Sequence, residues 1–179
     1  PLGKSPVIVD GDRTIAESGV IVEYLARTHG GGEWAPALDD PAYWNFNYWM
    51  HYAEASLMPP LLLKLVFSRL REPPVPFLIR PISRKIADQV DRAFTDPQIA
   101  THFGFVDAYL TDHEWFSGGA IGAADIQMSF PLEAARSRAV QAGQYPHIDA
   151  WLKRVHARPA YLRALEAGGE YAYGPDVDD

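Results

Sequence analysis

The chain has no cysteine, so disulfides, thiolate metal sites and a cysteine nucleophile are excluded within its 179 residues. It also lacks a long hydrophobic run, because the longest apolar stretch, at 58–67, contains Lys64 and is too short to span a bilayer. Positive charge is scarce, with 16 Lys and Arg against 23 Asp and Glu. The sequence has no basic stripe of the kind that binds nucleic acid. We therefore expect neither a nucleic-acid partner nor a membrane partner. The absence of cysteine is compatible with a cytoplasmic location.

The composition that remains is that of a globular protein. Hydrophobic residues make up 47% and charged residues 22% of the chain, which is enough to build a sizeable core. The length suits one ordinary domain or two small ones. The six histidines are scattered without the spacing of metal ligands, so no metal site is predicted.

The first 25 residues predict a strand, a tight turn, a second strand and a helix. Pro6 opens an apolar run at 6–9, residues 10–13 (DGDR) are typical of a hairpin turn, and 14–16 form a short returning strand. From Ser18 the spacing becomes helical and continues to the glycines at 30–32. The apolar stripe of this helix consists of Val20, Ile21, Tyr24 and Leu25.

Beyond a linker at 31–40, the pattern is almost entirely helical. The predicted helices cover 41–70, 82–110, 123 to about 140, 146–156 and 159–167. Pro59 and Pro60 should kink or divide the first of them, and the second has a possible interruption near Asp96–Pro97. The tail YAYGPDVDD is acidic and expected to fray, although its tyrosines could fold back.

Two short motifs near the start have both a functional and a structural interpretation. X-Pro is the kind of peptide bond that takes the cis form at low cost, and a cis Ser5–Pro6 bond would free the Ser5 backbone to pair with an extended peptide. The alternative is an ordinary trans proline at a strand edge. Ser18 is a good helix N-cap, the free N–H groups there attract a carboxylate, and Glu17 can pair with an ammonium group. The alternative is a capping serine after a solvated glutamate.

In combination, KSPV at 4–7 and AESGVIVEYL at 16–25 resemble the second half of the glutathione-binding domain of glutathione S-transferases. The resemblance implies an α/β thioredoxin-like domain, of which residues 1–30 are the C-terminal β-β-α half. A linker at 31–40 and an all-α helical bundle at 41–179 would follow. Two segments of the bundle, MPPLLLKL at 58–65 and MSFPLE at 128–133, look most like the microbial branch of bacterial and fungal transferases.

The resemblance also implies roles for individual residues. Pro6 would follow a cis bond, and Ser5 would bond the cysteinyl backbone of glutathione. Glu17 and Ser18 would hold the γ-glutamyl end. Lys4 is a weaker candidate, near a carboxylate of the peptide. Glutathione would be a co-substrate, with no prosthetic group.

A second motif, WFSGGAIGAADI at 115–126, resembles the family's capping motif before its buried helix. Asp125 can accept a bond from the Gly122 N–H, and Ile121 can pack against Ile126. The family usually has Ser or Thr where this chain has Gly122, so only half of the capping box is expected. We interpret the motif as structural.

A hydrophobic co-substrate site is expected where the helical domain faces the peptide. Tyr48, Tyr52 and Ser56 share one helical face at spacings of four, and a tyrosine hydroxyl can polarise a thiolate or a substrate. The alternative is stronger on general grounds, because an aromatic stripe at helical spacing is usually core or dimer interface.

The residue that activates the glutathione thiol in this family lies early in the first domain. We therefore expect it before residue 1, in a segment on the order of 50 residues long. The leading prediction is a detoxifying, homodimeric transferase that conjugates glutathione to hydrophobic electrophiles, with peroxidase activity as a further possibility. The rival is a non-catalytic binding or assembly module of the same fold. A third interpretation is a free-standing helical domain with an incidental hairpin.

Overall fold

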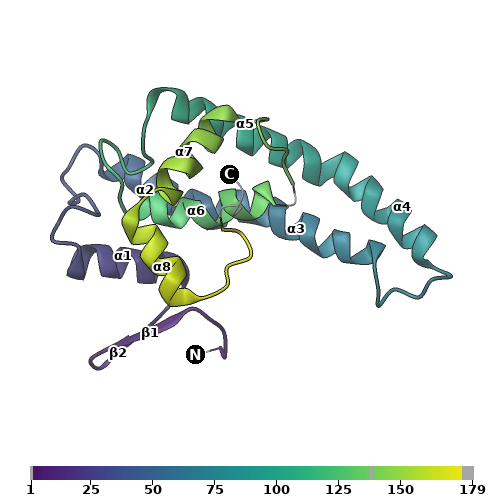
Figure 1. The fold of residues 1–179 in the computed structure, drawn as a ribbon, viewed down its shortest axis with the longest axis horizontal. Helices are drawn as coiled ribbons and strands as arrows, with labels where there is room; N and C mark the ends of the chain where they lie inside the picture. Colours follow the sequence, from purple (N-terminus) through teal and green to yellow (C-terminus); the bar gives the residue numbers. More distant parts are fainter. Residues whose placement is uncertain (1, 138, 175–179) are drawn as a thin grey trace.

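The computed structural model describes residues 2–137 and 139–174. Near its start, β1 (Val7–Asp10) and β2 (Arg13–Ala16) form an antiparallel hairpin. Gly11 in the turn has φ of 58°, a conformation that favours glycine. Figure 1 shows the hairpin at the lower edge of the helical body. The predicted hairpin is confirmed, with each strand extended by one residue at the turn.

Helix α1 (Ser18–His29) follows the hairpin directly and ends at Gly30. It packs against the hairpin and against the central helix α6 (Ala123–Arg136). Ile21 is buried, but Val20 and Leu25 are 54% and 44% exposed. The predicted apolar stripe is therefore wrong at two of its four positions, because α6 and the hairpin cover only part of the helix surface.

The first long helical run consists of α2 (Tyr43–Tyr52), the π-helix η1 (Ala53–Leu57) and α3 (Met58–Ser68). A short 3₁₀ turn, η2 (Arg69–Arg71), ends it. The two prolines lie in the first turn of α3 and the π-turn lies just before them, so the predicted division is confirmed. A proline has no N–H to bond the preceding turn, which is why the helix changes its hydrogen-bond pattern there.

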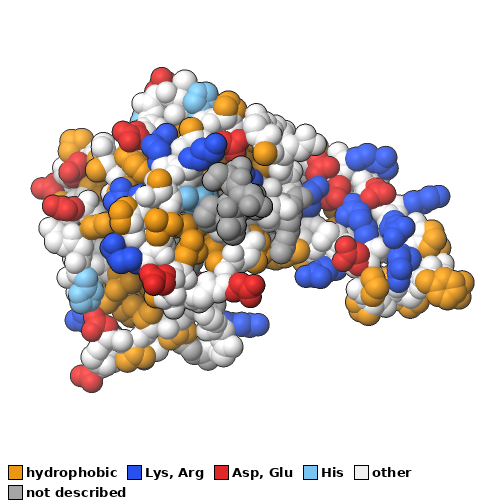
Figure 2. Space-filling view, in the orientation of Figure 1, with side chains coloured by type: hydrophobic (Ala, Val, Ile, Leu, Met, Phe, Trp, Pro, Cys, Tyr) orange, Lys and Arg blue, Asp and Glu red, His pale blue; other side chains and the backbone are white. Residues whose placement is uncertain are grey.

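The second run consists of α4 (Arg80–Val90), the π-helix η3 (Asp91–Thr95) and α5 (Asp96–Asp112). The predicted interruption is confirmed. α3 and α4 lie side by side and form an arm that projects from the body (Figure 1). Figure 2 shows Lys and Arg side chains gathered over this arm and hydrophobic ones at its tip, where Phe77 and Leu78 are about three-quarters exposed.

Helices α7 (Pro146–His156) and α8 (Pro159–Gly168) complete the bundle, each with proline in its first turn as predicted. Helix α6 ends at Arg136, four residues earlier than predicted. After α8, Tyr171 and Tyr173 fold back onto the body, which agrees with the alternative given for the tail. Residues 175–179 lie outside the described residues.

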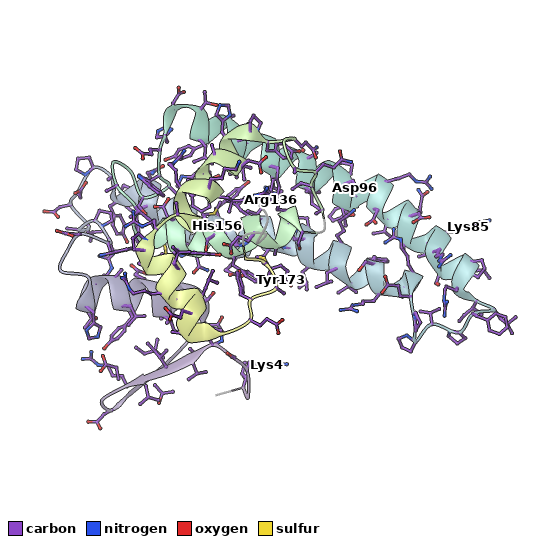
Figure 3. The ribbon with its side chains drawn as sticks, in the orientation of Figure 1. Lys4, Lys85, Asp96, Arg136, His156 and Tyr173 are labelled. Atoms are coloured by element: carbon purple, nitrogen blue, oxygen red, sulfur yellow. The ribbon has the colours of Figure 1, made fainter. Side chains whose placement is uncertain are left out.

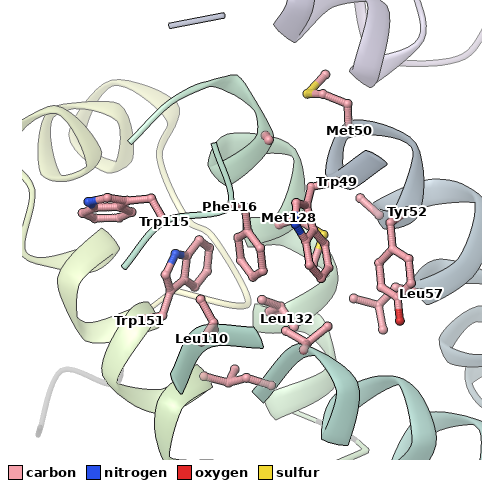
Figure 4. Close-up of a cluster of buried hydrophobic side chains, with 14 of the residues drawn as sticks. Trp49, Met50, Tyr52, Leu57, Leu110, Trp115, Phe116, Met128, Leu132 and Trp151 are labelled. Carbon is pink, nitrogen blue, oxygen red and sulfur yellow. The ribbon is translucent and has the colours of Figure 1, made fainter. Parts of the chain in front are cut away.

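The core surrounds α6. Its largest fully buried side chains come from α2, α5, α6 and α7 and from the segment before α6, and Figure 4 shows several of them packed together. Burying one such side chain contributes about 1.5–3 kcal/mol, so this cluster fixes α6 and everything that α6 contacts. The largest fully buried side chains include Phe46, Trp49, Phe103, Phe116, Met128, Leu132 and Trp151. Across the described ranges, every helix is too short or too polar to cross a membrane.

Candidate functional site

The Ser5–Pro6 peptide bond is cis, as the family resemblance implies, and the alternative of an ordinary trans proline is wrong. Pro6 directly precedes β1, whose first residue, Val7, pairs with Ala16. Within residues 2–137 and 139–174, no hydrogen bond involves the Ser5 backbone. Its N–H and C=O are therefore available to a ligand that extends beside the hairpin.

A hollow of about 430 Å³ lies beside this bond. Lys4, Ser5, Pro6 and Glu17 all contribute to its wall. Four of the five predicted glutathione residues thus meet at one place, although Lys4 and Glu17 are 13 positions apart in the chain. The hollow combines a cation, a carboxylate and an unpaired backbone, which are groups that recognise a zwitterionic peptide.

Glu17, and not Ser18, is the N-cap of α1, so the predicted role of Ser18 as cap is wrong. Glu17 has φ of 73° and ψ of 124°, and its carbonyl accepts the first bond of the helix, from Ile21 N–H. A positive φ is costly for a residue with a Cβ, and such strain is found most often at functional sites. Helix α1 therefore begins directly after Glu17, a residue that lines the hollow.

Ser18 is tied to the helical body instead. Its hydroxyl donates to Glu54 Oε1 at 3.3 Å and accepts from Gln127 Nε2 at 3.2 Å. Gln127 is 4% exposed and also donates to Glu54 Oε1 at 3.1 Å. One serine, one carboxylate and one amide from α1, η1 and α6 thus form a closed set of three hydrogen bonds.

Neither Glu54 nor Gln127 could be predicted from a sequence motif. They lie 36 and 109 positions after Ser18, and neither belongs to a motif of fixed spacing. Glu54 lies in the π-helix η1, and π-turns recur at functional sites. Its carboxylate lies beside Ser18, at the first turn of α1.

Tyr48 and Tyr52, two of the predicted co-substrate residues, face α5. Their rings stack on each other, both contact Phe105, and the Tyr52 hydroxyl is hydrogen-bonded to His102 Nδ1 at 2.6 Å. Burial raises the pKa of both tyrosines and lowers that of His102, which keeps this hydrogen bond between neutral groups. The contacts favour the core or interface alternative for this pair.

Ser56 does not continue the face of these tyrosines. It lies in the π-helix, whose wider turn breaks the spacing of four residues that the prediction assumed. Ser56 is half-buried. Its role in a co-substrate site stays a prediction.

A different cavity is mostly apolar. A pocket of about 270 Å³ lies between α3 and α6 and is closed on one side by the C-terminal segment. We call it the apolar pocket. Along the helical run it begins at Met58, four residues after Glu54. Its apolar wall includes Met58, Leu62 and Leu65 of α3, Phe130 and Ala134 of α6, and Tyr173.

The predicted helix cap at Asp125 is confirmed and extends further than expected. Asp125 is 1% exposed, and its carboxylate accepts from the backbone N–H groups of Gly122, Phe116 and Ser117 at 2.8–3.2 Å. Trp151 Nε1 donates to it at 3.3 Å. Burial outweighs these bonds and raises the pKa of Asp125.

Gly122 leaves no room for the usual family residue. A Cβ at this position would lie 2.6 Å from Ser117 Oγ and 2.9 Å from the Trp34 carbonyl oxygen. The same carbonyl accepts a bond from Ala123 N–H at 2.8 Å. Trp34, near the beginning of the 31–40 segment, is therefore in direct contact with the start of α6.

Comparison with protein families identifies two matching regions. The family described as "Glutathione S-transferase, C-terminal domain" matches residues 60–159, and "Glutathione S-transferase, N-terminal domain" matches residues 1–27. The chain is 32% identical to Glutathione S-transferase 1 of Saccharomyces cerevisiae, over 93% of this chain and 74% of that protein. It is 34% identical to Glutathione S-transferase 3 of Schizosaccharomyces pombe, over 93% of this chain and 68% of that one.

Solved structures give the same result for the fold. A glutathione S-transferase from Actinobacillus pleuropneumoniae superimposes with a TM-score of 0.75 at 29% identity, over 97% of this chain and 73% of that one. A sphingomonad glutathione S-transferase complexed with glutathione superimposes with a TM-score of 0.72 over 94% of this chain and 76% of that one. Its identity is 20%, so it supports the fold alone. The β-β-α unit and the helical bundle are thus those predicted from the sequence.

Proposed function

Because the chain belongs to the glutathione S-transferase family, and resembles its microbial and fungal members, we propose that it binds glutathione and transfers the thiolate to hydrophobic electrophiles. The observation that carries this proposal is the meeting of the Ser5 backbone and the Glu17 carboxylate at one hollow. Each feature alone has a structural explanation. Together they present an open backbone and a carboxylate to the same small volume.

Each of the five residues predicted to bind glutathione has a proposed role. Ser5 pairs with the cysteinyl backbone of glutathione, and Pro6 holds the turn that exposes Ser5. Ser18 and the free N–H groups of the first turn of α1 receive the γ-glutamyl carboxylate. Glu17 pairs with the γ-glutamyl ammonium group, and Lys4 lies near the glycyl carboxylate.

Glu54 and Gln127 support the γ-glutamyl end. The Glu54 carboxylate bonds Ser18 and lies beside the position proposed for the ammonium group, which would accept a second carboxylate partner. Gln127 holds both side chains in place from α6. The buried core therefore sets the geometry of the binding site.

We propose the apolar pocket as the co-substrate site, in preference to the face of Tyr48, Tyr52 and Ser56. Small-molecule sites are concave and mostly apolar with a few polar groups, and this pocket fits that description. It is also continuous along one helical run with Glu54. In the tyrosine pair, the Tyr52 hydroxyl is already hydrogen-bonded to His102.

The reaction forms a carbon–sulfur bond. The glutathione thiolate attacks the electrophilic carbon, the bond to the leaving group breaks, and the leaving group departs with the electron pair. The proton of the thiol passes to solvent when the thiolate forms. The residues assigned here hold and orient glutathione, and none of them is assigned as the group that lowers the thiol pKa. With a peroxide in place of the electrophile, the same thiolate would act as a reductant.

The oligomeric state and the cellular location are also proposals. Trp44, Tyr48 and Phe105 form an exposed aromatic patch on α2 and α5, with exposures of 70%, 47% and 47%. A second copy of the chain would bury this patch in a homodimer. A cytoplasmic enzyme that detoxifies electrophiles agrees with the absence of cysteine from the chain.

Glutathione binding tests the proposal directly. We expect Glu17→Gln and Ser18→Ala to raise the Kd for glutathione about tenfold, measured by titration calorimetry, because each removes a bond to a charged group. The melting temperature should change little. Glu23→Gln is the matched control, since Glu23 lies on the same helix and, among residues 2–137 and 139–174, pairs only with Arg27. Equal losses of affinity and stability would favour a purely structural role for these residues.

Turnover separates the proposal from its rival. Conjugation of glutathione to a chlorinated nitroarene is expected of the protein in its longest natural form. Binding of glutathione without turnover, there and in the 179-residue chain, would favour a non-catalytic binding or assembly module. No retention on immobilised glutathione would favour a helical domain with an incidental hairpin.

A further inference from the structure

Glu133 is a buried carboxylate that the proposed chemistry does not use. It lies on α6 with 4% exposure, and Oε1 accepts from His156 Nε2 and from the Tyr161 hydroxyl, both at 2.8 Å. Its other oxygen, Oε2, accepts from the Tyr171 hydroxyl at 2.6 Å. A buried carboxylate needs such donors, and these three come from α7, α8 and the C-terminal segment 169–174. Glu133 therefore joins four parts of the fold at one point.

The C-terminal segment reaches Glu133 because Gly169 reverses the chain after α8. Gly169 has φ of 78° and ψ of −154°, a conformation that is almost confined to glycine. Figure 1 shows the chain leaving α8 and returning toward α6. Burial, and then the bond to Glu133, raise the pKa of Tyr171, so its hydroxyl keeps the proton that it donates.

Tyr173 follows Tyr171 by two residues and forms part of the apolar pocket. Its ring contacts the rings of Tyr171 and Phe130 edge-on, with centroids 5.7 Å apart in both cases. Figure 3 shows Tyr173 close to His156 and Arg136, beneath the end of α6. A chain of contacts thus runs from Glu133 through Tyr171 and Tyr173 to the wall of the pocket.

We propose that Glu133 is a positioning residue that latches the C-terminal segment through Tyr171, so that Tyr173 closes the apolar pocket and limits the size of the co-substrate it admits. This inference rests on the proposed function for the identity of the ligand, an apolar electrophile. The latch itself rests on the contacts of Glu133 alone. Release of Tyr171 frees Tyr173 to move away from Phe130 and opens the pocket to bulkier molecules.

The first test measures the latch without any catalysis. Tyr171→Phe removes one hydroxyl from the C-terminal segment, and Tyr161→Phe is the matched control, because it removes a hydroxyl from the same carboxylate but leaves the segment bonded. We expect hydrogen exchange of the amides at 170–174 to become roughly fivefold faster in Tyr171→Phe, the effect of losing one hydrogen bond. Tyr161→Phe should leave those amides unchanged. Equal exchange in both variants would overturn the latch.

The second test measures selectivity. For a series of electrophiles of increasing size, we expect Tyr171→Phe to raise kcat/KM for the bulkiest about fivefold relative to the smallest, through KM, with kcat for the smallest unchanged. Tyr161→Phe should keep the wild-type ratio. An unchanged ratio in Tyr171→Phe would contradict the size limit even if exchange had increased.

The two proposals can fail separately. If none of the three proteins conjugates glutathione, the proposed function fails, and the association rate of an apolar fluorescent dye replaces the electrophile series. A faster rate for bulky dyes in Tyr171→Phe alone would still support the latch. The same rate in all three proteins would overturn it.

Discussion

The side-chain amide of Gln127 lies 3.2 Å from the hydroxyl of Ser18, although 109 positions separate the two residues in the chain. Gln127 belongs to the buried helix α6, and Ser18 is the first residue of α1. The contact fixes the end of α1 at which we place the γ-glutamyl group. A residue of the core thus acts on the proposed binding site through one polar contact.

We predict that Gln127→Met weakens glutathione binding about fivefold, because it removes the donor to Ser18 and Glu54 while keeping similar volume. Titration calorimetry with glutathione measures the change. Ser129→Ala on the same helix is the control, since its hydroxyl bonds only the carbonyl of Ile126. The idea is abandoned if the two variants bind glutathione equally well.

Glu17→Gly should separate stability from function. The φ of 73° at Glu17 is costly for any side chain and free for glycine, so the substitution should stabilise the fold by about 1 kcal/mol. It also removes the carboxylate proposed to pair with glutathione, so affinity should fall. Denaturant unfolding and calorimetry on one preparation test both effects. A variant that is less stable than wild type would show that the conformation is not strained.

Asp125→Ala should destabilise the protein by about 3 kcal/mol or more. Four N–H groups lose their acceptor, and three of them belong to the backbone where α6 begins. Urea unfolding measures the loss. Asp112→Ala is the control, because Asp112 is an exposed carboxylate at the end of α5. Unchanged stability with altered kinetics would instead assign Asp125 to the chemistry.

Asp91 should make the free energy of unfolding depend on pH in the acid range. Burial alone would raise its pKa, but the bond from Thr95 Oγ1 at 2.6 Å, the bond from Arg71 Nη2 at 2.7 Å and the charge of Lys64 outweigh it, and the net pKa is lowered. A lowered pKa stabilises the fold above the ordinary value of 3.8, and this contribution is lost as pH falls through the lowered value.

We therefore predict that Asp91→Asn costs about 2 kcal/mol at pH 7 and progressively less below pH of about 4. Urea unfolding of both proteins between neutral and acid pH gives the difference. Asp88→Asn is the control, since Asp88 also pairs with Arg71 but its side chain is 52% exposed. A difference that is constant with pH would exclude a charged Asp91 as its cause.

The sequence predicted those parts of the fold that depend on local signals. Gly11 marks the hairpin turn, Gly30 ends α1, and Pro146 and Pro159 begin α7 and α8. In each case one residue restricts its own backbone, so neighbouring residues are enough to predict the structure. The exposed side of α1 was not predictable, because burial there depends on which distant elements cover it.

The residues of the candidate site likewise fall into those that a local motif predicts and those that it does not. Ser5, Pro6 and Glu17 were found because they belong to a continuous motif whose order resembles a known family. Glu54, Gln127 and Glu133 were missed, because each acquires its role from partners between 23 and 109 positions away. The prediction that Ser56 shares a helical face with Tyr48 and Tyr52 was wrong, because residues 53–57 form a π-helix and do not keep the spacing of an α-helix.

Gly122 has a consequence for how the family can vary. Because the Ser117 side chain fills the space beside Gly122, a serine or threonine cap on α6 and a serine at 117 compete for one volume. A side chain at 122 would require a smaller residue at 117 and also a shift of the Trp34 carbonyl, which lies 2.9 Å from the same Cβ position. Substitutions at 117 and 122 are therefore expected to occur together when related chains are aligned, with a change in the backbone at Trp34.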